Sequence, residues 1–226
     1  MIYFFADDHF SVHPGKNIFE HLPEEWKKKI SFYENDFSVL ESGKWLSDCQ
    51  VLVLNMIGGT CNIPHPGSGA EKAVRQWCEK GGNILLLHGS SAAFWMWDYW
   101  RKLPGIRWVR PNDPDGAKPS THPVKPYKVT VCKSRHPLCA KLSEMDLPED
   151  EIYTELEYTS SVFPLMETRI GEGTFIQCCE TLSPWGGKII NFLPGHKESV
   201  TANTILIQNL IILMQYLSEG EKNEKI

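Results

Sequence analysis

The sequence contains no dense cluster of lysine and arginine. Its 23 basic side chains are outnumbered by 28 acidic ones, and the formal net charge is −5. Proteins that contact nucleic-acid phosphates need clustered positive charge, so we expect no nucleic-acid partner. No apolar run approaches the length of a membrane span, and the start, MIYFFADDHF, has neither a basic leader nor a small-residue cleavage site. We therefore expect a cytoplasmic protein with no membrane partner.

Patterns of paired cysteines are also missing. The seven cysteines are scattered, their number is odd, and no two of them form a CxxC pair. Such a set predicts neither a disulfide framework nor a zinc ribbon, and it agrees with a reducing cytoplasm. We expect each cysteine to act as a small buried hydrophobic residue.

The chain does contain enough apolar residues for one sizeable core. Of its 226 residues, 42% are hydrophobic and 23% are charged, which is typical of a globular protein. Because the sequence shows no internal repeat and no linker, we predict a single domain over residues 1–217. Residues 218–226 are charged and are predicted to form a tail.

The most informative stretch is GGNILLLHGSS, at residues 81–91. Residues 84–87 form an uninterrupted apolar run, as expected of a strand that is buried on both faces in a parallel sheet. The two glycines before this run end a helix, and the Gly-Ser-Ser after it predicts a sharp turn. His88 is thereby predicted at the carboxyl end of a central strand, where open α/β sheets bind their ligands.

The other elements are expected to alternate around this strand. Ser68 and Glu71 predict a capping box at the start of the clearest helix. A long irregular segment, rich in Pro, Gly, Asp and Asn, separates the two halves of the chain and is interpreted as either a lid or a dimer contact. The predicted strands cover residues 2–6, 37–40, 49–55, 127–132, 151–158, 174–179 and 188–193, the predicted helices cover residues 17–22, 24–30, 68–80, 92–102 and 201–217, and the irregular segment covers residues 104–126.

Four short motifs, taken in order, resemble the ThuA-like (trehalose utilisation) family of the class I glutamine amidotransferase-like superfamily. They are GGNILLLHGSS, the His136-Pro137 pair, DEIY at residues 150–153, and GGKIINFLPGH at residues 186–196. The resemblance covers nearly the whole chain. It implies a flavodoxin-like three-layer α/β/α sandwich with a mostly parallel sheet. It also implies a role in sugar metabolism, mainly of trehalose and related or oxidised disaccharides.

One departure from the superfamily is informative. Glutamine amidotransferases carry a cysteine nucleophile at the turn after the central strand, as part of a Cys-His-Glu triad. In this sequence the turn reads His88-Gly89-Ser90-Ser91 and contains no cysteine. We therefore do not expect glutamine hydrolysis, because no thiolate can be placed there.

The candidate site is a set of histidines and one carboxylate. His88 and His196 both match family motifs at strand-end turns, and imidazole suits acid–base chemistry and metal ligation near neutral pH. With His13, or alternatively His9, and with Glu151, they form a set that predicts a divalent metal such as zinc, with one position open for water. No nucleotide cofactor is expected. The alternative is that these histidines are structural.

Glu151, Tyr153 and Glu155 are expected to share one face of a strand. Glu151 is then a general base or a ligand, and Tyr153 donates a hydrogen bond to a sugar hydroxyl or carbonyl. The alternative is a solvated edge strand, whose charges prevent aggregation.

Four further residues are candidates for substrate binding: Ser90, Ser91, Trp95 and Asp98. A ring such as that of Trp95 can stack on a pyranose and Asp98 can accept a sugar hydroxyl, although the aromatic run 94–100 is foremost expected to be core. A serine after a strand-end turn, with His196 as its base, also imitates a nucleophile elbow, but GSS lacks the G-x-S-x-G pattern.

The function expected from these features is that of an enzyme of hydrolase or isomerase type, which acts on a disaccharide or keto-sugar with His88, Glu151, Tyr153 and His196 as catalytic residues. The alternative is a non-catalytic module that binds a sugar or a protein partner in the same cleft. A small carbohydrate is the expected partner, and the sequence leaves open whether the chain forms a homo-oligomer.

Overall fold

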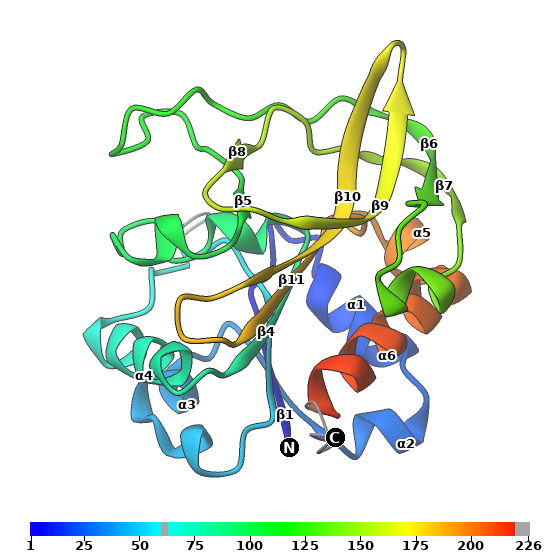
Figure 1. The fold of residues 1–226 in the computed structure, drawn as a ribbon. Helices are drawn as coiled ribbons and strands as arrows, with labels where there is room; N and C mark the ends of the chain where they lie inside the picture. The colour runs from blue at the N-terminus through cyan, green and yellow to red at the C-terminus, as the bar shows by residue number, and fades with distance from the viewer. Residues whose placement is uncertain (60–62, 220–226) are drawn as a thin grey trace, which may run out of the picture.

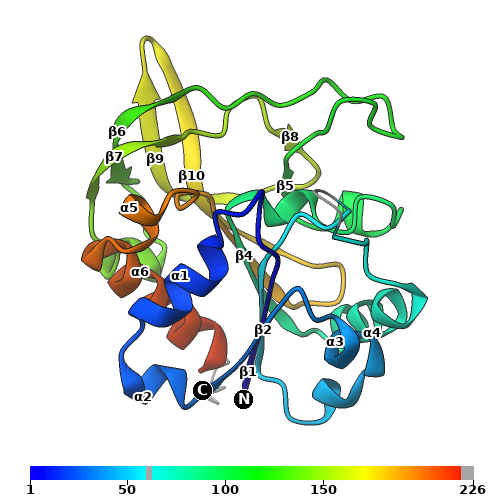
Figure 2. The same ribbon diagram turned by 180° about the vertical axis from the view of Figure 1, so that it is seen from behind.

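A nine-stranded sheet, with helices on both faces, forms the centre of the computed structural model, which describes residues 1–59 and 63–219 (Figures 1 and 2). The strand order is β2-β1-β3-β4-β11-β10-β9-β6-β7. The predicted three-layer α/β/α sandwich is confirmed. The strands are β1 (Ile2–Ala6), β2 (Ile30–Glu34), β3 (Val51–Asn55), β4 (Asn83–Leu87), β6 (Val124–Val131), β7 (Met145–Glu151), β9 (Phe163–Ile170), β10 (Gly173–Leu182) and β11 (Lys188–Phe192).

The first half of the sheet, from β2 to β11, is parallel. Every residue of β3 is buried, as are all residues of β4 except Asn83, which explains their continuous apolar sequences. Alternate residues enter the two cores on opposite faces of the sheet. Leu85 and Leu87 belong to one core, and Ile84 and Leu86 to the other.

The second half, from β10 to β7, is antiparallel. The β9–β10 hairpin, yellow in Figure 1, extends beyond the helical layers. A β-bulge between Ile176 and Cys178 bends β10, so that the same strand continues from the hairpin into the centre of the sheet beside β11. The sheet is thus parallel on one side of β11 and antiparallel on the other.

Helices cover the parallel half on both faces (Figure 1). One face carries α1 (Pro14–His21), α2 (Glu24–Lys27), α5 (Glu198–Thr201) and α6 (Thr204–Ser218), and the other carries α3 (Ser38–Ser42) and α4 (Ser68–Glu79). The last apolar segment, predicted as one helix over residues 201–217, is divided in two. Asn203 separates the two helices, since its side-chain oxygen accepts from the N–H groups of Ile205 and Leu206 at the start of α6.

Two local predictions near the N-terminus and at α4 were wrong. Residues 37–40 form the beginning of α3 and not a strand, and the second strand of the chain is β2. The capping box at Ser68 is absent: the N-cap of α4 is Gly67, without a side-chain cap, and Glu71 N–H donates to the Gly67 carbonyl. The backbone N–H of Glu71 is thus satisfied by a backbone carbonyl and not by the Ser68 hydroxyl, as the capping box would require.

The segment 92–102 is not an α-helix. It consists of turns between two short 3-10 helices, His88–Ala92 and Trp100–Lys102. Phe94 has a positive φ of 53°, which the interior of a right-handed α-helix does not accommodate. The rings of Phe94 and Trp97 stack with their centroids 4.0 Å apart, and both are buried. The expectation that these aromatics belong to the core is confirmed for Phe94, Trp97 and Trp100.

The predicted strand over residues 151–158 was also wrong. β7 ends at Glu151, and only Glu157–Tyr158 returns to strand geometry, as β8, which pairs with β5 (Ile106–Arg107). Glu155 has a positive φ of 54°. This break ends the alternation of side chains, so that Tyr153 is buried while Glu155 pairs with the exposed Lys118.

Replacement of Asn209 by alanine is expected to lower the free energy of unfolding by about 2 kcal/mol. The buried amide of Asn209 accepts from Ser143 N–H and donates to the Ser143 carbonyl, which ties α6 to the loop before β7. Removal of this amide leaves both backbone groups of Ser143 without a partner. Urea unfolding of the variant measures the loss.

Gln208→Ala is the matched control, because Gln208 is the preceding, exposed residue of the same helix. It is expected to change the free energy of unfolding by less than about 0.5 kcal/mol. Equal effects of the two substitutions would show that the Asn209 amide does not stabilise the fold.

Candidate functional site

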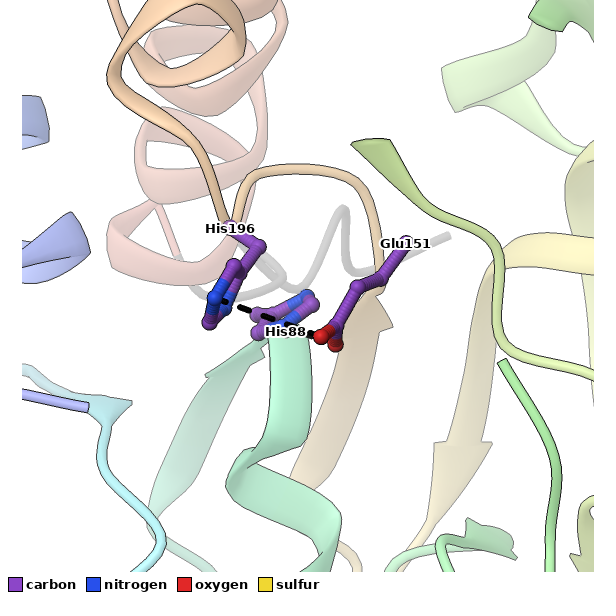
Figure 3. A group of neighbouring side chains, drawn as sticks. All are labelled: His88, Glu151 and His196. Atoms are coloured by element: carbon purple, nitrogen blue, oxygen red, sulfur yellow. Dashed lines mark ion pairs between the residues drawn. The ribbon is translucent and has the colours of Figure 1, made fainter. Parts of the chain in front are cut away.

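Three side chains that could bind a metal converge at the carboxyl edge of the sheet: His88, Glu151 and His196 (Figure 3). Their candidate ligand atoms all lie within 4.8 Å of one another. His88 Nε2 is 3.4 Å from Glu151 Oε2, and His196 Nε2 is 4.0 Å from Glu151 Oε1. The two imidazole rings have their centroids 5.1 Å apart. The sequence-predicted trio is therefore brought together in one place.

His88 occupies a sharp turn at the end of β4. It has a positive φ of 51° and begins the 3-10 helix His88–Ala92. The left-handed conformation is rare for a residue with a side chain, and it often marks a functional position. Gly89 follows, and a Cβ atom there would lie 3.1 Å from both the Tyr153 hydroxyl oxygen and a side-chain carbon of Ile57. A side chain at position 89 would therefore crowd both of these neighbours.

The hydrogen bonds of His88 determine which ring nitrogen carries the proton. Its Nδ1 lies 2.9 Å from the Leu193 carbonyl oxygen, and since a carbonyl only accepts, Nδ1 is the protonated donor. In the neutral ring Nε2 is then an acceptor, and the Tyr153 hydroxyl donates to it at 2.9 Å. A histidine fixed in this way presents a lone pair toward Glu151 and His196.

His196 is held by the carboxylate before Glu151. Asp150 is fully buried, and its two oxygens accept from the backbone N–H groups of Gly195, His196 and Lys197. Burial and the neighbouring His88 lower the pKa of His196 to about 4, although the nearby Glu151 opposes this shift. The imidazole of His196 is therefore neutral at physiological pH, as a metal ligand or a general base must be.

Glu151 is the carboxylate of the cluster. Burial alone would raise its pKa, but the proximity of the His88, His196 and His122 imidazoles lowers it to about 2. His122 Nδ1 lies 3.5 Å from Glu151 Oε1. Glu151 is therefore ionised at neutral pH, and the imidazoles of His88, His122 and His196 surround its carboxylate.

A second pair, Asp7 and His9, lies behind this cluster at the end of β1. Both side chains are 0% exposed, and His9 Nδ1 is 2.6 Å from Asp7 Oδ1. The other oxygen of Asp7 accepts from Ile57 and Gly58 N–H. Burial would raise the pKa of Asp7, but these bonds keep it below its ordinary value. The ring of His9 lies 5.8 Å from that of His88, so His9 and not His13 adjoins the cluster.

His13 does not reach the candidate metal site. Its ring is 42% exposed and pairs with Glu34 at 3.0 Å. His13 also adopts a left-handed backbone at the start of α1, where the chain turns away from the sheet edge. The assignment of His13 as a ligand is therefore not supported by the geometry.

A cavity of about 540 Å³ opens in front of the cluster. Its volume lies in the range of small-molecule sites. Aromatic and imidazole rings of its wall contact one another, since the Trp108 ring centroid lies 4.4 Å from that of Tyr153 and 5.2 Å from that of His122. The lining residues are Phe10, Ile57, His88, Gly89, Trp108, Arg110, Pro111, His122, Glu151, Tyr153 and His196.

The long segment predicted over residues 104–126 forms one wall of this cavity, through Trp108, Arg110, Pro111 and His122. It has little regular structure, but it is fastened by polar contacts. Buried Arg107 pairs with Asp113 at 2.6 Å and with Glu157 at 2.6 Å, and Trp108 N–H donates to Ser91 Oγ. The segment therefore forms part of the site, and its role as a lid or a dimer contact stays a prediction.

The four predicted substrate-binding residues lie outside the cavity lining. Ser90 is buried, and its hydroxyl bonds to the Leu54 and Leu87 carbonyls and to Met56 N–H. Ser91 is equally buried against Trp108, and Asp98 is 88% exposed and paired with Arg101. Trp95 contacts the cavity only indirectly, under Arg110. A Ser90 nucleophile with His196 as base has no support in these contacts.

Sequence reasoning missed Trp108, Arg110 and His122. They come from the irregular segment, where no periodicity indicates which side chains share a face. A signal did exist, because a long loop in a compact domain is often functional and this one contains a tryptophan, an arginine and a histidine. None of the six cysteines in the described residues lines the cavity.

The profile of the ThuA family, described as trehalose utilisation, matches residues 2–212. The chain belongs to the ThuA family. The predicted family resemblance is thereby confirmed over nearly the whole sequence. A search among curated proteins found no match.

Solved structures with a similar fold include other ThuA-like proteins. One, from Parabacteroides merdae, has a TM-score of 0.74 and 14% identity, and the match covers 100% of this chain and 91% of that chain. Another, from Bacteroides uniformis, has a TM-score of 0.68 and 16% identity over 98% and 93% of the two chains. A β-galactosidase from Bacillus circulans has a TM-score of 0.56 and 9% identity, over 93% of this chain and 30% of that chain. At these identities the likeness shows the fold alone.

None of the helices in residues 1–59 and 63–219 is both long enough and apolar enough to cross a bilayer.

The shifted pKa of His196 predicts a loss of stability in acid. Its folded-state pKa of about 4 lies below the ordinary value of 6.5, so between these values the unfolded chain binds a proton that the folded chain does not. His196 therefore leaves the free energy of unfolding unchanged above pH 6.5 and lowers it progressively as the pH falls toward 4. Between pH 7.5 and pH 5, we expect the wild type to lose about 2 kcal/mol of unfolding free energy relative to His196→Gln.

Urea unfolding at a series of pH values measures this difference. Gln208→Ala, at an exposed position of α6 that carries no titrating group, is the control, and its difference from the wild type is expected to stay constant over the same range. A His196→Gln difference that does not change with pH would show that this imidazole is not kept neutral by its surroundings.

Proposed function

We propose that this ThuA-family protein is an enzyme of carbohydrate catabolism, of hydrolase or isomerase type, that acts on a disaccharide or keto-sugar with a divalent metal held by His88, Glu151 and His196. The observation that supports it best is the His-Glu-His cluster in the lining of the cavity. A cytoplasmic location belongs to the same proposal.

The residues present fit a metal such as zinc. Two imidazoles and one carboxylate are a donor set that catalytic zinc sites use, with one position left open. The Nδ1–H of His88 is fixed on the Leu193 carbonyl, which is the outer contact that orients a metal-binding histidine. His196 is neutral and Glu151 is ionised at neutral pH, as ligands must be.

A metal bound here would supply a Lewis acid, which polarises a carbonyl oxygen or lowers the pKa of a water molecule. The residues of the chain would do the rest. Tyr153 bonds to His88 Nε2, and occupation of that lone pair would free its hydroxyl to donate to the substrate. Burial raises the pKa of Tyr153 well above its usual value, so the hydroxyl stays a donor. His122, half exposed beside Glu151, could exchange protons with solvent.

The cavity also suits a sugar. A flat ring at its wall, that of Trp108, can cover the apolar face of a pyranose, and polar groups beside it can bond to hydroxyls. A volume of about 540 Å³ leaves room for more than one sugar ring. These features support a carbohydrate of disaccharide size as the ligand.

Metal binding can be tested by titration of the metal-free protein with zinc in a calorimeter, together with elemental analysis of the purified protein. We expect one equivalent of metal per chain. Since an outer-shell change typically costs about 10- to 100-fold in metal affinity, loss of a ligand in His88→Ala or Glu151→Gln is expected to cost at least that much. Chelation is expected to lower the melting temperature of the wild type.

His13→Asn is the matched control. His13 is a histidine of the same N-terminal region that lies away from the cluster, so this variant is expected to bind zinc like the wild type. Absence of metal from the purified protein, with a melting temperature that chelation leaves unchanged, would contradict the metal site.

Turnover separates an enzyme from a binding module. With metal supplied, a keto-disaccharide is expected to be converted by the wild type, and Glu151→Gln is expected to retain the fold but lose most of the rate. Chromatography of the products measures conversion. Stabilisation by the sugar without any turnover would favour a non-catalytic module in the same cleft.

A further inference from the structure

Arg110 is the one arginine that lines the cavity. Its Nη2 donates to the Ile57 and Gly58 carbonyls, at 2.8 and 3.0 Å, and its guanidinium lies over the Trp95 ring, 5.1 Å from the ring centroid. These contacts fix the position of the guanidinium but leave its charge without a counterion. The buried Nε has no acceptor in the described parts of the chain.

The neighbouring arginines show what a structural arginine looks like in this segment. Arg101 pairs with Asp98 and Asp115, and Arg107 pairs with Asp113 and Glu157. Each of these two guanidiniums thus lies against at least two carboxylates. Arg110 has no ion pair within residues 1–59 and 63–219.

The carboxylate that most affects Arg110 is Asp7, and this carboxylate is already occupied. Asp7 contacts His9 and accepts from two backbone N–H groups, so it makes no ion pair with the arginine. Among the described residues that line the cavity, the acid is Glu151, which three imidazoles surround. Arg110 is therefore a fixed cation of the cavity lining that no carboxylate of residues 1–59 and 63–219 neutralises.

We propose that Arg110 binds an oxyanion of the substrate, so that the carbohydrate carries a carboxylate or a phosphate. This proposal rests on the proposed function, because it places the anionic substituent on the sugar that the His-Glu-His cluster acts on. Nη2 is engaged by the two carbonyls and Nε is buried, so the guanidinium offers an oxyanion its positive charge and its Nη1 N–H groups. A charge-assisted hydrogen bond of this kind is about twice as strong as a neutral one. The contacts with Ile57, Gly58 and Trp95 orient the guanidinium in advance.

Three probes with the same ring separate the two sources of the anion: glucose, glucuronate and glucose 6-phosphate. Their dissociation constants are measured by ligand-observed NMR titration at low ionic strength, with metal present. In the wild type we expect one of the two anions to bind about 10- to 100-fold more tightly than glucose. A preference for glucuronate identifies a carboxylate, and a preference for glucose 6-phosphate identifies a phosphate.

In Arg110→Met the ratio of anion to glucose affinity is expected to approach one, and in Arg110→Lys it is expected to be intermediate, since the charge is kept but the fixed geometry of the guanidinium is lost. A ratio is used because it is insensitive to a partial loss of folded protein. Arg169→Met, at an exposed arginine of β9, is the matched control and is expected to keep the wild-type ratio. Equal affinities for all three probes in the wild type, or an unchanged ratio in Arg110→Met, would overturn the proposal.

A separate measurement distinguishes failure of this inference from failure of the proposed function. Acetate and inorganic phosphate, without any sugar, are tested for an increase in melting temperature of the wild type and of Arg110→Met. An increase that needs Arg110, in a protein that neither binds the three sugars nor converts the keto-disaccharide, would support the anion site and contradict the carbohydrate function. No increase, no sugar binding and no turnover would overturn both.

Discussion

The hydrogen bond between His88 and the Leu193 carbonyl is the contact on which the site depends. It follows from the register of two parallel strands, because Leu87 of β4 is paired with Phe192 of β11 and the residues after them are therefore neighbours. A shift of one residue in this pairing would place His88 beside a different backbone group. The bond also decides the tautomer, and with it the chemistry that His88 offers to Glu151 and His196.

The site lies where the two kinds of sheet meet. The parallel half supplies His88 and, after the turn that follows β11, His196, while the antiparallel half supplies Glu151 and Tyr153. Asp150 connects them, since a carboxylate at the end of β7 accepts from the backbone of the turn that carries His196. Adjacent residues of one strand thus have different tasks. Asp150 orients the turn, and Glu151 faces the imidazoles.

The sequence predicted the parts of the site that follow buried runs. His88 and His196 come at or shortly after the ends of continuous apolar strands, and the carboxyl edge of a parallel sheet brings such positions together. Glu151 came from a motif of the family, and its supposed strand partner Glu155 does not share its environment, because the backbone turns at Glu155. The edge of the sheet was predictable, but the path of the chain beyond it was not.

The same limit explains the other errors. Strand 37–40 was expected from a few apolar residues, which fit a short helix equally well. The aromatic run 92–102 has helical composition, but its rings are placed by core packing, which overrides local propensity at Phe94. The cavity wall of Trp108, Arg110 and His122 depends on ion pairs such as that of Arg107, between residues far apart in sequence. Periodicity carries no information about such pairs.

The division of the site between two half-sheets has a consequence for the way the molecule holds together. A ligand that contacts His88, His196 and Glu151 at once spans the junction of β11 with the antiparallel strands, and it can bind only while that junction is closed. Its binding free energy would add directly to the cohesion of the two halves. Occupancy would then slow local opening, and amide exchange in β7 and β10 would report it more clearly than exchange in the already well-covered β3.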